Sequence, residues 1–244
     1  MMPEKTEISV ILPVYNEEDK IEKTIRLTDF VMKNLGRKYE IIIVDDGSTD
    51  ATRLRIINYT KTKNHIKLLT HEENFGKGRA LRDGFKCAKG DIIIYIDGDL
   101  DISPLQIPQY VNAVLSGNDL VIASKWHPDS CVSMHLARKF LNCVFNVLVK
   151  LLLRLRYRDT QTGLKAFKRK KIEKILPKFF VDGYAFDVEL LSVAKHYGLK
   201  VAELPVEAMI YDNISFNEIL NMLIDILKIS YRLRISKAYF ITDR

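Results

Sequence analysis

The sequence predicts an α/β fold in which a mostly parallel sheet is flanked by helices, and three observations support that prediction. In the first half of the chain, short apolar runs of strand length alternate with longer segments whose apolar residues recur at helical spacing. The runs are apolar at consecutive positions, which is typical of strands covered on both faces. Several of them end abruptly in acidic residues. Because ligands of such sheets bind at the carboxyl ends of strands, these acids mark the candidate functional edge.

The size and composition of the chain suit a folded unit with a large core. Its 244 residues are 47% hydrophobic, which is enough for one large α/β domain or two small ones. No repeat, low-complexity tract or Pro/Gly-rich linker interrupts the sequence. We expect one domain over residues 1–211, including an amphipathic basic helix at about 134–158, and then an amphipathic helical segment over residues 212–244.

Strands are expected where apolar runs are bounded by turn residues. The first ends at Pro13, whose missing N–H is tolerated at the end of a strand. The fourth contains five consecutive large apolar residues from Ile92 to Ile96. The expected strands are residues 7–13, 39–45, 66–70, 91–97 and 119–124.

Helices are expected between these strands, where apolar residues recur at helical spacing. Residues 17–35 form the first, and Gly36 is its stop signal. The second follows Ser48, Thr49 or Asp50, any of which can cap it. The other expected helices are one that follows residues 74–79 and ends near Gly90, one that begins at Pro104, one over about 134–158 and one over 217–235.

Three carboxylates at alternate positions follow the fourth strand: Asp97, Asp99 and Asp101. A like-charge pair about 4 Å apart costs roughly 4 kcal/mol at an effective dielectric constant near 20, so the group needs a proton, a basic side chain or a cation. Oxygen ligands suit Mg²⁺ or Mn²⁺, which often complete their coordination with substrate phosphates. The alternative is a solvated turn, since Asp and Gly are common in turns. The position after a buried strand favours the metal site.

The charge balance and the cysteines limit the partners and the compartment. A net charge of +7 suggests an anionic partner, which is nucleic acid, acidic lipid or a phosphorylated substrate. Cys87, Cys131 and Cys143 show neither a disulfide framework nor zinc-site spacing, so we expect a reducing, cytosolic setting. The first residues lack the apolar core of a signal peptide, and no apolar stretch is long enough to cross a membrane.

Two segments of the second half combine apolar residues with cations. Residues 138–158 carry six cations and no acid, and residues 217–235 end in Lys228, Arg232 and Arg234. Such helices suit the plane of an anionic membrane surface; the alternative is a core helix whose basic end is solvated.

A non-enzymatic nucleic-acid-binding protein is a remote alternative. Because the cations alternate with aliphatic residues rather than with aromatic ones, no nucleic-acid partner is expected.

Nucleotide-binding motifs narrow the chemistry. The sequence has no Gly-x4-Gly-Lys-Ser/Thr motif, and Gly76-x-Gly78 lacks the third glycine of a dinucleotide fingerprint. The strand ends at residues 13–18, 44–50 and 97–99 offer an aromatic ring for a base, acids for ribose and base, and an acid pair for a metal-bound diphosphate. This combination predicts a nucleoside-diphosphate site.

These three strand ends, with residues 74–78 between them, resemble the inverting, metal-dependent GT-A glycosyltransferases, a family that includes the polyprenyl (dolichyl) phosphate sugar synthases. The likeness runs from about residue 7 to residue 207. Segments 159–167, 184–191 and 203–206 resemble the dolichyl-phosphate glucose synthases somewhat more than the mannose enzymes. The resemblance implies a GT-A, Rossmann-like fold.

The resemblance also implies roles for individual residues. Asp99 and Asp101 would coordinate Mg²⁺ or Mn²⁺ on the diphosphate, although the mannose enzymes often have glutamine at the second position. Lys125 stands where the family usually has arginine, so Arg138 is the best candidate for a bidentate phosphate contact. The residues implied to hold the nucleoside are Pro13, Tyr15, Glu17, Val44 and Asp46, with Asp97 and Gly98 alongside.

Two further features are less clearly defined by the resemblance. Asp187, with Glu189 as its neighbour, is implied either as a catalytic base or as a cap of the helix that begins near Tyr184. A phosphate nucleophile is largely ionised near neutral pH, so a base is not obligatory. Residues 212–216 lack the lysine that relatives often carry in a Gly-Ser-Lys segment.

The implied reaction is a single in-line displacement at the anomeric carbon of a hexose carried by a nucleotide-diphosphate sugar, UDP-glucose or GDP-mannose. The nucleophile is a membrane-borne polyprenyl (dolichyl) phosphate, and the metal and basic residues stabilise the departing nucleoside diphosphate. The protein would then be cytoplasmic and peripherally attached to the cytoplasmic face of a membrane. A transferase of the same fold acting on a soluble or polysaccharide acceptor is the alternative, and it predicts activity that is independent of lipid.

Overall fold

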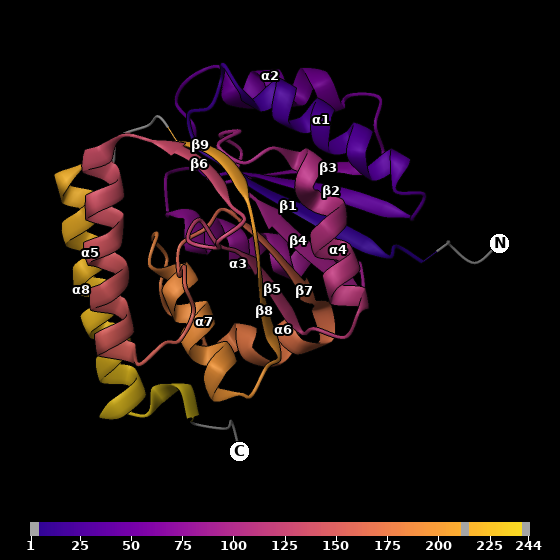
Figure 1. The fold of residues 1–244 in the computed structure, drawn as a ribbon. Coiled ribbons are helices and arrows are strands. Elements are labelled where there is room, and N and C mark those ends of the chain that lie inside the picture. The colour runs from indigo at the N-terminus through magenta and orange to yellow at the C-terminus, as the bar shows by residue number, and fades with distance from the viewer. Residues whose placement is uncertain (1–4, 211–214, 241–244) are drawn as a thin grey trace.

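A computed structural model describes residues 5–210 and 215–240 of the chain. It contains a seven-stranded sheet with helices on both faces and a separate two-stranded sheet (Figure 1). The strands are β1 (Ile8–Val14), β2 (Tyr39–Asp45), β3 (Ile66–Thr70), β4 (Ile92–Ile96), β5 (Leu120–Ala123), β6 (Cys131–Met134), β7 (Leu164–Lys168), β8 (Val201–Leu204) and β9 (Glu207–Ile210). The α-helices are α1 (Ile21–Asn34), α2 (Thr52–Thr60), α3 (Lys77–Cys87), α4 (Ile107–Leu115), α5 (Leu136–Leu153), α6 (Arg169–Ile175), α7 (Phe186–His196) and α8 (Phe216–Arg234). Short 3₁₀ helices are η1 (Pro104–Gln106), η2 (Leu176–Lys178) and η3 (Ala238–Phe240).

The larger sheet has the strand order β3-β2-β1-β4-β7-β5-β8. β1 pairs in parallel with β2 and β4, and β2 pairs in parallel with β3, so the carboxyl ends of the first strands lie at one edge. β7 runs antiparallel between β4 and β5. The predicted mostly parallel sheet is confirmed, but the antiparallel β7 was not predicted from the sequence.

The two faces of the sheet carry separate hydrophobic cores. In β1, Ile11 belongs to the core that includes α3 and α7, whereas Val10 and Leu12 belong to the core that includes α1 and α4. Successive side chains of a strand point to opposite faces. Covering both faces therefore requires apolar residues at consecutive positions, which explains the uninterrupted apolar runs of the sequence.

The first helix begins later than predicted. α1 starts at Ile21 rather than near Glu17, and two backbone N–H groups of the loop before it are bound by side chains around the start of α2. The N–H of Glu17 donates to Thr52 Oγ1 at 2.8 Å, and the N–H of Glu18 donates to Asp50 Oδ2 at 3.2 Å. These bonds tie the end of β1 to the start of α2 and fix the loop that follows β1.

The predicted basic helix ends earlier than residue 158. α5 stops at Leu153 because Arg154 adopts a left-handed backbone with φ 53°, a conformation that ends a helix. Side chains of Lys195 and Arg234 donate to backbone carbonyls at this end of α5. α8 agrees closely with its prediction and begins at a capping box formed by Ser215 and Glu218.

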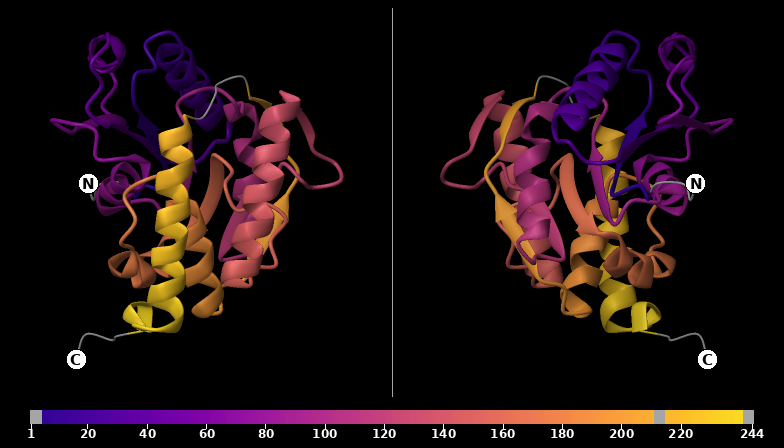
Figure 2. Two further views of the ribbon diagram at one scale, coloured as in Figure 1. Left: turned by 90° about the vertical axis from the view of Figure 1, so that its left-hand side faces the viewer. Right: turned by 90° about the vertical axis from the view of Figure 1, so that its right-hand side faces the viewer.

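No helix in residues 5–210 or 215–240 combines the length and the apolar character that a membrane-spanning segment needs. α5 and α8 pack against each other along one side of the protein, and they stand in front of the sheet in the left view of Figure 2.

Glu189 joins three parts of the second half. Its fully buried carboxylate accepts hydrogen bonds from the N–H groups of Phe180 and Val181 and from the hydroxyl of Tyr239. Burial raises the pKa of this carboxyl. The side chain therefore fastens α7 to the preceding loop and to η3.

Candidate functional site

The carboxyl ends of β1, β2 and β4 form the floor of two adjoining pockets. The β1 pocket, about 360 Å³, is lined by residues that include Pro13, Tyr15, Asp46 and Gly98. The α5 pocket, about 330 Å³, lies between the acidic loop after β4 and helix α5. Lys77, Asp97, Asp99, Glu17 and Tyr184 are among the residues that line both pockets.

Most of the predicted nucleoside-binding residues do meet in the β1 pocket. Pro13, Tyr15, Glu17 and Asp46 line it, as do Asp97 and Gly98. Val44 is different, because its fully buried side chain belongs to the core beneath the sheet. β2 directs that side chain into the core, and a role of Val44 in holding the nucleoside stays a prediction.

Asp46 also organises the loop opposite β1. Its carboxylate receives His71 Nδ1 at 2.6 Å, the N–H of Phe75 at 3.1 Å and the N–H of Gly76 at 2.7 Å. Gly76 has φ +99°, and an added Cβ would lie 2.5 Å from the carbonyl oxygen of Asp182, so only glycine fits there. The acid at the end of β2 thus shapes the pocket wall that leads into α3.

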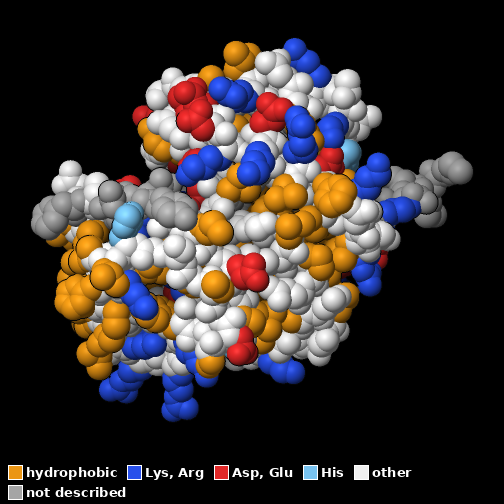
Figure 3. All heavy atoms as spheres, turned by 45° about the horizontal axis from the view of Figure 1, so that its top comes forward, with side chains coloured by type: hydrophobic (Ala, Val, Ile, Leu, Met, Phe, Trp, Pro, Cys, Tyr) orange, Lys and Arg blue, Asp and Glu red, His pale blue; other side chains and the backbone are white. Residues whose placement is uncertain are grey.

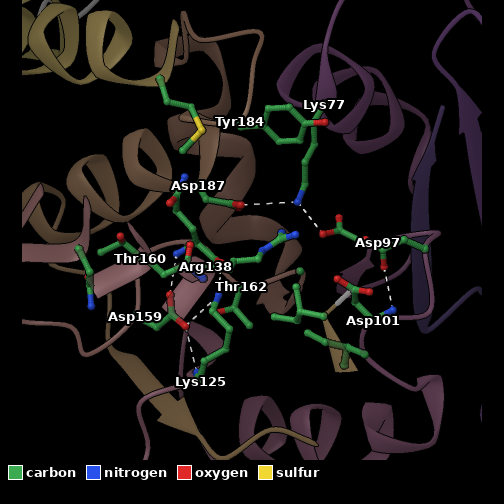
Figure 4. Close-up of a pocket in the computed structure, with 18 of the residues that line it drawn as sticks. Lys77, Asp97, Asp101, Lys125, Arg138, Asp159, Thr160, Thr162, Tyr184 and Asp187 are labelled. Atoms are coloured by element: carbon green, nitrogen blue, oxygen red, sulfur yellow. Dashed lines mark hydrogen bonds and ion pairs between the residues drawn. The ribbon is translucent and has the colours of Figure 1, made fainter. Parts of the chain in front are cut away.

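A buried network of charges lies where the two pockets meet. Lys77 Nζ is 2.7 Å from Asp97 Oδ2 and 3.6 Å from Asp187 Oδ2, so it stands between the two carboxylates (Figure 4). Deeper in the sheet, Lys165 Nζ is 2.9 Å from Asp187 Oδ1 and 2.5 Å from the hydroxyl of Tyr95, which also donates to Asp187. Of the three carboxylates expected to need compensation, Asp97 is paired with a lysine, and a second lysine neutralises Asp187.

The pKa values in this network differ between the two carboxylates. Burial raises the pKa of Asp97 to about 6, and the nearby charge of Asp99 adds to the shift against the opposing effect of Lys77. Burial acts in the same direction on Asp187, but Lys165 and Lys77 outweigh it and hold its pKa below the usual value. Asp187 is accordingly an ionised, weakly basic carboxylate whose bonds are taken up by cations.

The loop after β4 places two carboxylates on the α5 pocket. Leu100 adopts φ 60°, an unusual backbone for a side-chain-bearing residue, and the N–H of Asp101 donates to Asp99 Oδ1 at 3.0 Å. Asp99 and Asp101 both line the pocket. Among the described residues, no group of three or more acidic, His or Cys side chains forms a metal cage. Two carboxylates that leave the remaining positions to phosphate oxygens match the way proteins bind Mg²⁺.

Lys125 is less available than the sequence suggested. Its Nζ lies 3.1 Å from Asp159 Oδ2 and donates to the carbonyl of Gln161 at 2.5 Å. The pKa of Asp159 is lowered although burial opposes this, because the Lys125 charge stabilises the carboxylate. Lys125 still lines the pocket, but a partner 34 positions further along the chain already balances its charge.

Arg138 reaches from α5 into the pocket (Figure 4). Its Nε and Nη1 are buried and have no hydrogen-bond partner in the described structure. Other partnerless buried atoms on the walls of the same pocket are Asp97 Oδ1, Asn146 Oδ1 and Thr162 Oγ1; over the described residues, the remaining ones belong to Ser124 and Arg169. Because buried polar atoms are normally paired, their concentration here marks the α5 pocket as a candidate site for a polar ligand.

Helix α5 turns three polar residues toward the pocket, while Val149 and Leu153 near its end pack into the core. Arg138, Asn142 and Asn146, spaced by four residues, line the pocket. The opposite side exposes large apolar residues, including Phe140 at 69% and Leu151 at 73% of their surface. α8 repeats this arrangement, with pocket-lining and exposed apolar residues on the same helix. The exposed apolar residues of the two helices are Leu136, Phe140, Leu141, Val144, Val147, Leu151, Leu220, Ile224, Leu227, Tyr231 and Ile235.

We call this set of residues the outer apolar surface. In Figure 3, hydrophobic side chains gather over the side where α5 and α8 lie, with Lys and Arg below them. Exposed cations on the two helices include Lys139, Lys228 and Arg234, and Arg154 follows the last residue of α5. An exposed apolar surface of this extent with a basic border is typical of a binding surface rather than of ordinary solvent-facing helices.

The structure also revealed site residues without an assigned role in the sequence. Lys77, Asn142 and Asn146 line the α5 pocket, together with Thr162 and Tyr184. Polar residues spaced by four within the apolar stretch of α5 are the one sequence signal for the asparagines. Residues 212–216, where relatives often carry a lysine and this chain has none, are described only in part, because positions 212–214 lie outside the described residues.

Comparison with known proteins gives a consistent family assignment. Residues 9–176 match the family model described as glycosyl transferase family 2. A dolichyl-phosphate beta-glucosyltransferase of Dictyostelium discoideum is 30% identical over 92% of this chain and 74% of its own length. Glycosyltransferase AglD of Haloferax volcanii is 33% identical over 82% of this chain, which spans only 33% of that protein.

Solved structures show the same fold. Glucosyl-3-phosphoglycerate synthase of Mycobacterium tuberculosis, in complex with Mn²⁺, UDP and phosphoglyceric acid, superposes with a TM-score of 0.73. The alignment covers 98% of this chain and 80% of that one at 24% identity.

Removing the charge of Asp187 separates a structural role from a catalytic one. The Asp187→Asn variant leaves Lys165 buried without its carboxylate, so we expect the free energy of unfolding to fall by about 3–5 kcal/mol. In urea denaturation, the double variant Asp187→Asn/Lys165→Met should lose less than the sum of the two single variants. A stable Asp187→Asn protein whose turnover is abolished would instead make this carboxylate a participant in the chemistry.

Proposed function

This chain belongs to glycosyl transferase family 2, and on that premise we propose that it transfers a hexose from a nucleotide-diphosphate sugar to a polyprenyl (dolichyl) phosphate in a membrane, with inversion at the anomeric carbon and dependence on a divalent metal. The observation that carries the proposal is the double character of α5. One side of the helix presents a partnerless guanidinium to an acid-lined pocket, and the other side presents a broad apolar surface. A phosphate at the head of an apolar chain matches both sides.

The β1 pocket is suited to the nucleoside diphosphate. Tyr15 offers an exposed ring on which a base can stack, and carboxylates of Glu17 and Asp46 stand on the same walls. A solved structure with the same fold carries UDP, and a relative is named a glucosyltransferase. The donor is therefore UDP-glucose or GDP-mannose, with the dolichyl-phosphate relatives favouring glucose.

Asp99 and Asp101 are the residues that would hold Mg²⁺ or Mn²⁺ against the diphosphate. When bound, the cation supplies positive charge to the departing nucleoside diphosphate. Lys77 keeps Asp97 beside this loop without adding another uncompensated negative charge. This pairing reduces the negative charge at the acid-rich edge of the sheet, which favours binding of the negatively charged nucleoside diphosphate.

Arg138 is the residue that would bind the acceptor phosphate. Its Nε and Nη1 are two donors without a partner on a charged, planar group, each of which can bond a phosphate oxygen, and the hydroxyl of Thr162 offers a further donor. Lys125 contributes positive charge from the opposite wall, reduced by Asp159. Because a phosphate monoester is largely ionised near neutral pH, it attacks without help from a base, which agrees with the low pKa of Asp187.

The outer apolar surface would rest on the membrane that holds the lipid acceptor. Burying a Phe or Leu side chain contributes about 1.5–3 kcal/mol, and cations near an anionic surface add about 1 kcal/mol each. This orientation brings the α5 pocket next to the lipid layer. It also supports peripheral attachment; the cytoplasmic face stays an expectation from the sequence.

Changing the first metal-binding carboxylate tests the proposed chemistry. Asp99→Asn keeps the side-chain size but removes the charge that attracts the cation, so we expect sugar transfer to polyprenyl phosphate to fall at least about 100-fold. Binding of Mn²⁺ in the presence of the nucleoside diphosphate, measured by calorimetry, should weaken in parallel. Asp91→Asn, which alters an exposed acid at the opposite end of β4, is the matched control. Full activity of Asp99→Asn with metal present would refute the assignment.

Charged substitutions on α5 test the membrane surface. The double variant Phe140→Asp/Leu151→Asp should sediment with anionic phospholipid vesicles at least about tenfold less than the unaltered protein, because it places charge where apolar side chains enter the lipid layer. Phe30→Asp/Leu54→Asp changes similarly exposed apolar residues on α1 and α2 and should leave sedimentation unchanged.

Equal sedimentation of the α5 variant and the unaltered protein would remove the role of this surface. Transfer to a soluble acceptor without any vesicle binding would favour the alternative, a transferase of the same fold that acts away from membranes.

A further inference from the structure

Asn146 lines the α5 pocket and carries a buried acceptor without a partner. The residue lies on the inner side of α5 and is only 8% exposed, yet its Oδ1 has no hydrogen-bond partner in the described structure. A buried acceptor without a partner costs about 1–3 kcal/mol. The cost would be recovered if a ligand in the pocket donated a hydrogen bond to this oxygen.

The orientation of the Asn146 amide is fixed by its other end. Nδ2 donates to the backbone carbonyl of Arg158, just before the buried Asp159. Reversing the amide would set its oxygen against that carbonyl oxygen, so the hydrogen-bond pattern assigns the nitrogen to this side. The atom of Asn146 that is left without a partner is therefore one that accepts hydrogen bonds and cannot donate them.

The hydrogen-bond donors and acceptors on the wall of the α5 pocket match different groups of a ligand. Arg138 and Thr162 have unused donors, which suit the oxygens of a phosphate. Asn146 requires a group with a hydrogen to give. Positions 138 and 146 are eight residues apart, about 12 Å along a helix, so the amide and the guanidinium lie two turns apart on one face.

A polyprenyl phosphate has an apolar chain and a phosphate but no sugar-like hydroxyl groups, whereas the hexose carries several hydroxyls. The geometry points to Asn146 as a specificity-determining residue that accepts a hydrogen bond from one hydroxyl group of the transferred sugar. This inference rests on the proposed function, in that it takes the donor to be a nucleotide sugar. A pocket that hydrogen-bonds a substrate hydroxyl strongly disfavours analogues that lack it, because the buried acceptor is then left unpaired.

The test pairs one substitution with one missing hydroxyl. Nucleotide sugars in which one hexose hydroxyl at a time is replaced by hydrogen are compared with the intact donor, in the unaltered protein and in Asn146→Leu, which fills a similar volume without an acceptor. For one particular deoxy donor, the unaltered protein should lose about 10- to 100-fold in kcat/KM. Asn146→Leu should use that deoxy donor and the intact donor nearly equally well.

Binding gives a second readout that does not depend on turnover. By calorimetry, Asn146→Leu should weaken binding of the nucleotide sugar about 10-fold or more and leave binding of the nucleoside diphosphate unchanged. Asn146→Ala is a smaller replacement to be used if Leu disturbs packing. Asn118→Ala is the matched control, because Asn118 also donates its amide to a backbone carbonyl, that of Ala113, but lines neither pocket.

Each outcome bears on a different conclusion. The role of Asn146 is overturned if the free-energy effects of Asn146→Leu and of removing a hydroxyl are additive for every deoxy donor. It is also overturned if the variant loses affinity for the nucleotide sugar and for the nucleoside diphosphate equally. Selective recognition of sugar hydroxyls by a protein that transfers nothing to polyprenyl phosphate supports the role of Asn146 while contradicting the proposed acceptor.

Discussion

Lys77 allows an acid-rich edge to exist in a buried place. The parallel pairing of β1 with β2 and β4 brings their carboxyl ends together, and the acids that follow these strands would repel one another. Lys77 stands between Asp97 and Asp187, and Lys165 balances the deeper side of Asp187. With these charges compensated inside the protein, the loop that carries Asp99 and Asp101 is left facing the pockets. This charge compensation supports the proposal that a metal-bound diphosphate binds at this edge.

The second constraint is the orientation of α5 and α8. In an ordinary surface helix the apolar side faces the core, whereas α5 turns Arg138, Asn142 and Asn146 inward and leaves Phe140 and Leu151 exposed. This inversion has a physical reason when the inner side meets a polar ligand and the outer side meets lipid. α8 also contributes walls to the β1 pocket, so the same two helices connect the proposed membrane surface with both substrates.

The sequence was sufficient to predict the strands that carry the site. β2 and β3 have the predicted bounds, because consecutive apolar residues ending in turn or acidic residues are a strong local signal. β7 was missed because its place in the sheet depends on pairing with β4, far away in the chain. The charge balance of Lys125 was likewise invisible, since Asp159 becomes its neighbour only through folding. Val44 was placed at the ligand by resemblance, but the alternation of β2 sends its side chain into the core. Local sequence patterns were thus sufficient to locate the functional edge of the sheet. Which side chains at that edge already have a charge partner depends on contacts between residues far apart in the sequence.

The central claim is that one pair of pockets brings a nucleotide sugar to a lipid phosphate. The most direct measurement incubates the purified protein with Mg²⁺ or Mn²⁺, vesicles containing polyprenyl phosphate, and UDP-glucose or GDP-mannose labelled in the sugar, and follows the label into the organic phase. Label from one donor should enter the lipid fraction as a β-linked sugar phosphate if the donor is α-linked, and chelation of the metal should stop the transfer. No lipid-bound label from any nucleotide sugar, with the protein folded and metal present, would contradict the claim.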